Sequence, residues 1–158
     1  MADDILLKLT DVPGESKKTG HENEIDVMSV SWSASNSTQS AYGGGGGGSG
    51  NVNFTDVSIT KMTDASSHLL QLRCFNGKPM DEAKLTFRKQ GGEQEEYLIA
   101  TLTNVYVSSY SISHGGGGDP MESVSLSFDK YKFAYKQQQD DGTLSGEKTA
   151  EWDVKAAS

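Results

Sequence analysis

Apolar and polar side chains alternate at every second residue over most of this chain, and no other feature of the sequence constrains the fold as strongly. Strands with one buried and one solvated face produce this pattern. Clusters of Gly, Pro, Asp and Asn separate the alternating segments, as turns between strands do. The segments are 5–9, 24–35, 51–62, 83–90, 97–113, 122–136 and 148–154. The sequence therefore predicts an all-β, antiparallel fold.

Two of these segments change which parity is apolar. The apolar side chains move from odd to even positions at Val27-Met28 and from even to odd positions at Asp129-Lys130. A strand whose buried face changes in this way needs a bulge or a sharp bend. Such bends are typical of barrel corners, so we expect a closed antiparallel β-barrel made of two packed sheets.

One segment has the signals of a helix instead. Asp64 is a suitable N-cap residue, Gly77 suits the left-handed position after the last turn, and Pro79 prevents continuation. The residues between them form one wide apolar face, which we expect to dock on the side of the barrel. That face consists of Leu69, Leu70, Leu72, Cys74 and Phe75.

The 158 residues suit one domain, spanning 1–158. Residues 36–50 are of low complexity and contain six consecutive glycines, which predicts a long, flexible, extended loop. Within it, Gly43 to Gly50 resembles a phosphate-binding loop only in its glycine content, because the terminal Lys-Ser/Thr pair and the following helix are missing.

Charge and cysteine content exclude several classes of protein. The formal net charge is −8, which disfavours nucleic acid and anionic membranes as partners. Cys74 is the only cysteine, so no intramolecular disulfide forms and folding in a reducing cytoplasm is expected. The N-terminal residues contain neither a signal-peptide core nor an apolar run of about 18 residues. We therefore expect no membrane insertion.

The sequence predicts no catalytic, cofactor-binding or metal site. His21, His68 and His114 are widely spaced, and Ser58 and Lys61 match a hydrolase spacing only within a predicted strand. The sequence therefore does not contain the group of catalytic side chains that an enzyme needs. A small-molecule carrier barrel is the other alternative, but it needs an empty interior. The aromatic side chains Trp32, Phe54, Phe87 and Phe128 are expected to fill that interior.

Several short motifs follow one another along the chain in a characteristic order. Residues 12–16 read VPGES and are followed by His21 and EIDV, and Ser-Trp-Ser surrounds Trp32. Residues 87–92 read FRKQGG, and EYL at 96–98, VSSY at 107–110 and WD at 152–153 come after them in order. Together these motifs resemble the Hcp family (haemolysin-coregulated protein) of type VI secretion systems, which has an alanine in place of Gln90.

The resemblance implies a small, tail-tube-like barrel that assembles with itself. Members form hexameric rings that stack into the hollow inner tube, which a contracting sheath expels with a spike protein at its tip. Some members also act as receptor and chaperone for effectors inside the ring. The expected partners are thus further copies, sheath, spike and effectors. The protein is expected to be made in the cytoplasm and secreted to the extracellular space without a signal peptide.

Two candidate sites follow from these expectations. In the second strand, Met28, Val30 and Trp32 would fill the barrel, while the three serines between them would point outward and face the ring lumen. The alternative is an ordinary solvated strand face. A ring-stacking loop is the other candidate, with a simple spacer as its alternative. The lumen residues are Ser29, Ser31 and Ser33, and the loop residues are Gly43, Gly44, Gly45, Gly46, Gly47, Gly48, Ser49 and Gly50.

Overall fold

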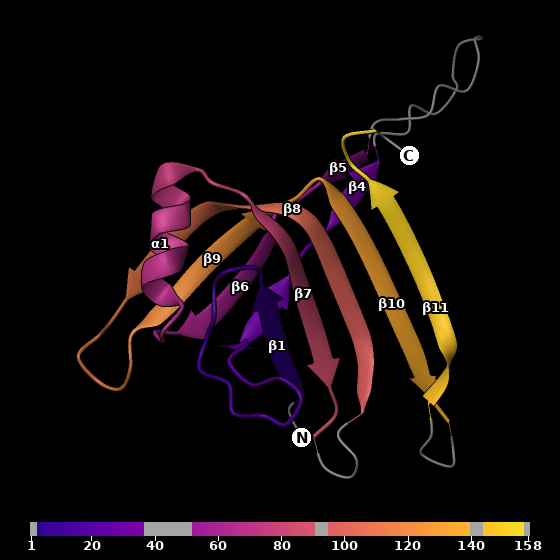
Figure 1. Ribbon diagram of the computed structural model, residues 1–158, viewed down its shortest axis with the longest axis horizontal. Coiled ribbons are helices and arrows are strands. Elements are labelled where there is room, and N and C mark those ends of the chain that lie inside the picture. The colour runs from indigo at the N-terminus through magenta and orange to yellow at the C-terminus, as the bar shows by residue number, and fades with distance from the viewer. Residues whose placement is uncertain (1–2, 37–51, 91–94, 140–143, 157–158) are drawn as a thin grey trace.

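The computed structural model describes residues 3–36, 52–90, 95–139 and 144–156, and its elements are mostly β-strands with one short helix (Figure 1). The elements are β1 (Asp4–Leu9), β2 (Ile25–Val27), β3 (Ser29–Ser31), β4 (Ala34–Asn36), β5 (Val52–Phe54), β6 (Val57–Met62), α1 (Ser67–Asn76), β7 (Met80–Arg88), β8 (Glu96–Ser113), β9 (Met121–Ser127), β10 (Lys130–Gln138) and β11 (Leu144–Asp153).

The strands pair antiparallel in the order β2-β1-β7-β8-β9-β6-β3, and β10 and β11 extend this sheet from β8. The 18-residue strand β8 organises the whole arrangement. Its first half pairs with β7 on one side and β10 on the other, whereas its second half pairs with β9. The two ends of the order, β2 and β3, are consecutive in the chain and are separated by Met28 alone.

The two changes of parity lie at breaks between strands. The predicted strand 24–35 is divided into β2, β3 and β4, and the predicted strand 122–136 into β9 and β10. At the second break the backbone N–H of Asp129 donates to the carbonyl of Thr103 at 3.0 Å, while Asn104 has a left-handed φ of 54°. The bends inferred from apolar parity are thus confirmed, but the long strands are interrupted rather than continuous.

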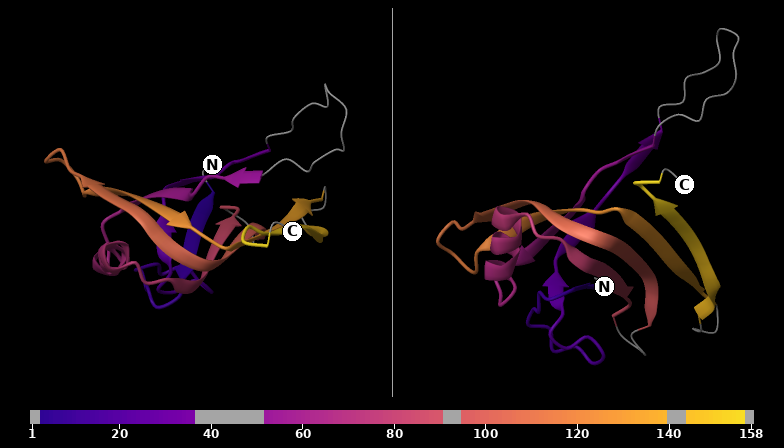
Figure 2. Two further views of the ribbon diagram at one scale, coloured as in Figure 1. Left: turned by 90° about the horizontal axis from the view of Figure 1, so that it is seen from above. Right: turned by 45° about the horizontal axis from the view of Figure 1, so that its top comes forward.

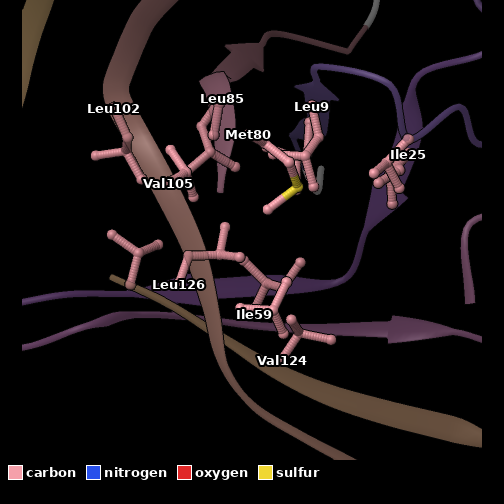
Figure 3. Close-up of a cluster of buried hydrophobic side chains, with 14 of the residues drawn as sticks. Leu9, Ile25, Ile59, Met80, Leu85, Leu102, Val105, Val124 and Leu126 are labelled. Carbon is pink, nitrogen blue, oxygen red and sulfur yellow. The ribbon is translucent and has the colours of Figure 1, made fainter. Parts of the chain in front are cut away.

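The core lies between the two curved halves of the sheet (Figure 3). Leu102 and Leu85 come from β8 and β7, and Ile59, Val124 and Leu126 face them from β6 and β9. Each of these side chains is at most 1% exposed. Burial on this scale contributes roughly 1.5–3 kcal/mol per aliphatic side chain and is the main source of stability.

After β1 the chain folds back over the sheet through the predicted turn at Gly14. The N–H of Gly14 donates to the carbonyl of Asn23 at 2.7 Å. A Cβ at this position would lie 2.5 Å from the carbonyl oxygen of Glu24, so only glycine permits this close approach. The turn after β7 at Gly91-Gly92 and the turn at Asp141-Gly142 lie outside the described residues.

The helix α1 lies against β8, and its predicted apolar face is correct for Leu69, Leu70 and Cys74, which pack on the core, but wrong for the other two residues. Gly77 takes the left-handed conformation, with φ 68°, as expected. However, Leu70 is the only apolar side chain of the helix that is fully buried, and Leu72 and Phe75 are 51% and 74% exposed. The N-cap residue is Ser66 and not Asp64. The Asp64 carboxylate lies before the helix and accepts a hydrogen bond from the backbone N–H of Ser66 at 2.8 Å.

β4 and β5 form a separate two-stranded ribbon that leads away from the other strands (Figure 2). Aromatic side chains anchor its base, with the ring of Phe54 6.0 Å from Phe128 and 6.3 Å from Tyr131. Trp32 packs on Tyr131 from the adjacent turn and donates its indole N–H to the Tyr131 hydroxyl at 3.2 Å. Three of the four aromatic residues predicted to fill the interior lie in this cluster, and the fourth, Phe87, joins it through Trp32 at a ring distance of 6.4 Å.

Candidate functional site: a hydroxyl-lined sheet face

The outer face of β3, β6, β9 and the second half of β8 is lined by serine and threonine side chains. The alternating positions of the same strands supply the core, so the hydroxyls must point the other way. The strand register places them in two rows across four strands. One row is Ser29, Thr60, Ser123 and Ser111, and the other is Ser31, Ser58, Ser125 and Ser109. All are exposed or half-buried.

Neighbouring hydroxyls on this face, which we call the hydroxyl face, bond to one another across the strands. The oxygens of Ser29 and Thr60 are 2.5 Å apart, and those of Ser58 and Ser125 are 3.4 Å apart. A hydroxyl that is engaged by a neighbour still has acceptor capacity left. The face is therefore smooth and weakly hydrogen-bonding, and it carries no charged side chain in either row.

The structure places the predicted serines at one edge of this face. Ser29 and Ser31 lie in β3, and Ser33 lies beyond it, where its backbone N–H donates to Thr55 Oγ1 at 2.8 Å. All three are exposed. The predicted packing of the alternate side chains is correct for Val30 and Trp32, which pack on the core. It is wrong for Met28, which is 51% exposed because the chain bends there between β2 and β3.

Sequence reasoning missed the other members of the hydroxyl face. The segment Ser123-Val124-Ser125-Leu126-Ser127 has the same alternation as the second strand and signals such a face by itself. The cross-strand rows depend on long-range pairing and were not accessible from the sequence. The loop residues Gly43–Gly50 lie outside the described residues.

Methionines border one end of the hydroxyl face. Met62 and Met121 are directly opposite each other in the β6–β9 ladder. Met28 and Met62 line a surface hollow of about 320 Å³, together with the carboxylates of Glu15, Asp26, Asp64 and Asp119. The three methionines are 40–51% exposed, whereas Met80 in the core is 3% exposed.

A buried ion pair lies behind this end of the face. Lys61 and Glu122 are 0% and 1% exposed, and Lys61 Nζ donates to Glu122 Oε1 at 2.9 Å. Lys61 Nζ also donates to Asp64 Oδ1 at 2.9 Å and to the carbonyl of Met62 at 2.8 Å. Burial raises the pKa of Glu122, but hydrogen bonds from Lys61, Tyr110 and Ser67 outweigh it and hold the pKa below its ordinary value. The pair fixes the start of α1 to the sheet.

The candidate catalytic and metal-binding side chains are dispersed. His21 is 8% exposed and is hydrogen-bonded by Nδ1 to Glu24 at 2.7 Å and by Nε2 to Glu96, so it ties the folded-back segment to β8. His68 lies on α1, and Cys74 packs partly on the core from the same helix. Within the described ranges no three His, Cys, Asp or Glu residues are grouped as metal ligands.

A search for membrane spans gave a negative result for the described part of the chain. The helix there is neither long nor apolar enough to cross a bilayer.

Comparisons with known proteins identify the family. The family model described as "Type VI secretion system effector, Hcp" matches residues 6–135. "Protein hcp1" of Pseudomonas aeruginosa is 48% identical over 149 residues, which cover 92% of this chain and 91% of that protein.

Solved structures agree with this assignment. A type six secretion system protein superposes with a TM-score of 0.92 at 27% identity, covering 99% of both chains. Hcp1 from Salmonella typhimurium superposes with a TM-score of 0.82 at 32% identity, covering 100% of this chain and 99% of that one. The chain therefore belongs to the Hcp family of secreted type VI secretion proteins, in which it is a structural tube and effector component and not an enzyme.

Proposed function

We propose that six copies of this chain form a ring whose lumen is lined by the hydroxyl face, and that such rings stack into a hollow tube. The partners of this tube are the sheath, the spike protein and the effectors of the type VI apparatus. The chain is made in the cytoplasm and leaves the cell through that apparatus. Inside the ring, effectors are held and protected until they are released.

The hydroxyl face is the observation that carries this proposal. A channel for varied cargo must bind each cargo weakly and release it again. Side chains that are short, uncharged and already hydrogen-bonded to one another satisfy both needs, because they offer contacts without deep pockets or strong ion pairs. The two rows span four strands, so the face is broad enough to form a wall.

The subunit fits a closed barrel, as the tube requires. The backbone N–H of Met28 donates to the carbonyl of Thr60 at 2.8 Å. The residue between β2 and β3 is therefore also bonded to β6, and β2 continues to β1 on the other side. We infer that the sheet closes on itself through this corner, which leaves few free edges for uncontrolled pairing.

Stacking of rings is assigned to residues 43–50 on the sequence alone. The ribbon of β4 and β5 supports this assignment, because its residues are exposed or half-buried and it leads away from the barrel strands (Figure 2). Shortening the run Gly43–Gly48 is expected to leave rings intact while tube growth falls. Normal tube growth would make the segment a spacer.

The test of the lumen combines mass measurement with one substitution. Light scattering of the purified protein should give the mass of a hexamer, and a stable monomer at micromolar concentration would contradict the proposal.

Ser31→Gln adds a longer polar side chain in the middle of the hydroxyl face and should leave rings intact while lowering retention of a ring-bound effector. The control Thr149→Gln, on the exposed face of β11, should retain the effector as the unchanged protein does. Equal retention in both variants would place Ser31 outside the lumen.

A further inference from the structure

Methionine side chains continue the hydroxyl face beyond its rows of serine and threonine. Met62 lies two residues after Thr60 on β6 and therefore points to the same side of the sheet. Met121 has the same relation to Ser123 on β9. The two methionines are directly opposite each other in the β6–β9 ladder. The next row of this face is therefore made of thioethers and not of hydroxyls.

These methionines are exposed, although methionine is among the residue types that are most often buried in folded proteins. Met28, Met62 and Met121 are 51%, 40% and 41% exposed, whereas Met80 in the core is 3% exposed. Surfaces that bind varied partners are often rich in methionine, because its unbranched thioether repacks around different shapes. The exposure of three methionines at one end of the hydroxyl face therefore indicates a contact surface.

The hollow that Met28 and Met62 line has a volume of about 320 Å³ and is acidic. We call it the methionine hollow. Its volume lies near the lower limit of sites that enclose small ligands, about 300–1,000 Å³, so it can take a side chain but not a folded element. Four carboxylates line it, and within the described part of the chain no lysine, arginine or histidine does so. They belong to Glu15, Asp26, Asp64 and Asp119.

Two of these carboxylates already have a counter-charge in the chain. Asp26 and Asp64 lie 3.0 Å and 2.9 Å from lysine Nζ atoms. Glu15 and Asp119 are exposed, and neither takes part in an ion pair with another described residue. The hollow therefore has two negative charges without a counter-charge beside an apolar wall.

This combination fits a long cationic side chain. Lysine and arginine have an aliphatic stem that packs on apolar surface while the charged head stays near water. The thioethers of Met28 and Met62 supply the wall for the stem. The carboxylates of Glu15 and Asp119 accept hydrogen bonds from the head, and such charge-assisted bonds are stronger than neutral ones.

We propose that the methionine hollow binds a lysine or arginine side chain from a basic, partly apolar segment of an effector that lies along the hydroxyl face. This inference rests on the lumen proposed above and names one chemical feature of its cargo. A second copy of this chain is a poor occupant, because its net charge is −8. Exposed ion pairs are weak and are screened by salt, so the hollow adds affinity without preventing release.

The test follows the methionine methyl groups by NMR in protein with isotope-labelled methionine. The probes are a short peptide of alternating leucine and arginine and the same peptide with glutamate in place of arginine. The arginine peptide should shift the methyl signals of Met28 and Met62 and leave the signal of Met80 unchanged. The glutamate peptide should shift none of them at the same concentration. High salt should weaken binding of the arginine peptide, because it screens exposed charges.

Two double substitutions separate the hollow from the overall charge of the protein. Glu15→Gln with Asp119→Asn removes the two carboxylates without a counter-charge and should weaken binding of the arginine peptide about fivefold. Asp81→Asn with Glu82→Gln, at exposed positions of β7, removes the same number of charges and should leave the affinity unchanged. Met62→Gln should also weaken binding, because the stem then loses part of its apolar wall.

Three results would overturn the inference: unshifted methyl signals of Met28 and Met62, equal binding of the two peptides, or equal weakening by the two double substitutions. The proposed lumen is tested separately. A hexamer by light scattering and lower effector retention in Ser31→Gln would leave the lumen standing while the hollow fails. If the unchanged protein is monomeric, the ring proposal fails, and the titration still decides whether the hollow binds a basic segment.

Discussion

The strands around the aliphatic core and the β10–β11 hairpin belong to one sheet but differ in how they bury their apolar side chains. In the core, residues such as Leu85, Leu102 and Leu126 are fully enclosed by the chain's own strands. In the hairpin, Phe133 and Tyr135 continue the same face but remain partly exposed. The core strands therefore bury their apolar side chains within the chain, whereas the hairpin leaves part of its apolar surface accessible.

The largest expected effect follows from the loss of the buried ion pair between Lys61 and Glu122. Lys61→Met leaves the carboxylate of Glu122 buried without its counter-charge, because both side chains are at most 1% exposed. Removing one partner of such a pair typically costs about 3–5 kcal/mol. We expect a large fall in the midpoint of thermal unfolding measured by circular dichroism.

The double substitution Lys61→Met with Glu122→Leu is the control. It removes both charges together and should recover most of the lost stability, since apolar side chains of similar volume can replace a buried pair. If the Lys61→Met variant unfolds at the same temperature as the unchanged protein, the pair contributes nothing to stability, and the sheet depends on its aliphatic core alone.

Substitutions in the two regions should separate folding from assembly. Leu102→Ala opens a cavity in the aliphatic core and should cost about 2–5 kcal/mol of unfolding free energy, whether rings are present or not. Phe133→Ala should cost less in separated subunits and should chiefly weaken rings. Urea unfolding of dilute subunits and light scattering of concentrated protein measure the two effects. Equal destabilisation of dilute subunits by both substitutions would make the hairpin an ordinary part of the core.

Two glycines, one in a close backbone contact and one exposed, allow a similar comparison of stability. Gly14→Ala places a Cβ 2.5 Å from the carbonyl oxygen of Glu24, in the segment that folds back over the sheet after β1. Overpacking of this kind costs about 1–3 kcal/mol. Gly115→Ala is the control, because nothing lies within 4 Å of its Cβ and its φ is not positive. Its unfolding midpoint should not move, and an equal loss in both variants would contradict the close approach at Gly14.

Strand positions and bends could be predicted from the sequence because they depend on local alternation. The changes of parity at Val27-Met28 and Asp129-Lys130 are local signals, and both coincide with breaks between strands. The helix stop at Gly77 is equally local. Membership of the Hcp family, inferred from motif order, is confirmed by the family match and the relatives.

The errors arose where the covering layer is remote in sequence. Periodicity shows that Leu72 and Phe75 share an apolar side of α1, but it does not show whether the chain itself or another molecule covers that side. The burial of Lys61 was also missed, since its partner Glu122 is 61 residues away and meets it only through the β6–β9 ladder. The hydroxyl face was recognised in one strand of four for the same reason.

The smallest expected effects are changes in stability at low pH, which should differ between a buried ion pair near the core and an exposed ion pair in the β10–β11 hairpin. Asp4 is 8% exposed and accepts from Arg88 Nη2 at 3.2 Å, whereas the hairpin pair Lys132–Glu151 has side chains that are 47% and 65% exposed. Burial raises the pKa of Asp4, but hydrogen bonds from Gln90 and Arg88 and the charge of Lys18 outweigh it and hold the pKa below its ordinary value.

A carboxyl whose pKa is lowered by folding stabilises the protein above its unfolded pKa and loses that contribution as the pH falls through the folded value. The Asp4→Asn variant should therefore be less stable than the unchanged protein at pH 7, and the difference should shrink between about pH 5 and pH 2. Glu151→Gln should follow the curve of the unchanged protein at every pH, because exposed pairs contribute little in water. Thermal unfolding midpoints measured across this range compare the three proteins. A difference at Asp4 that persists unchanged at pH 2 would show that Asp4 acts through packing and not through its charge, and the contrast between buried and exposed pairs would then fail.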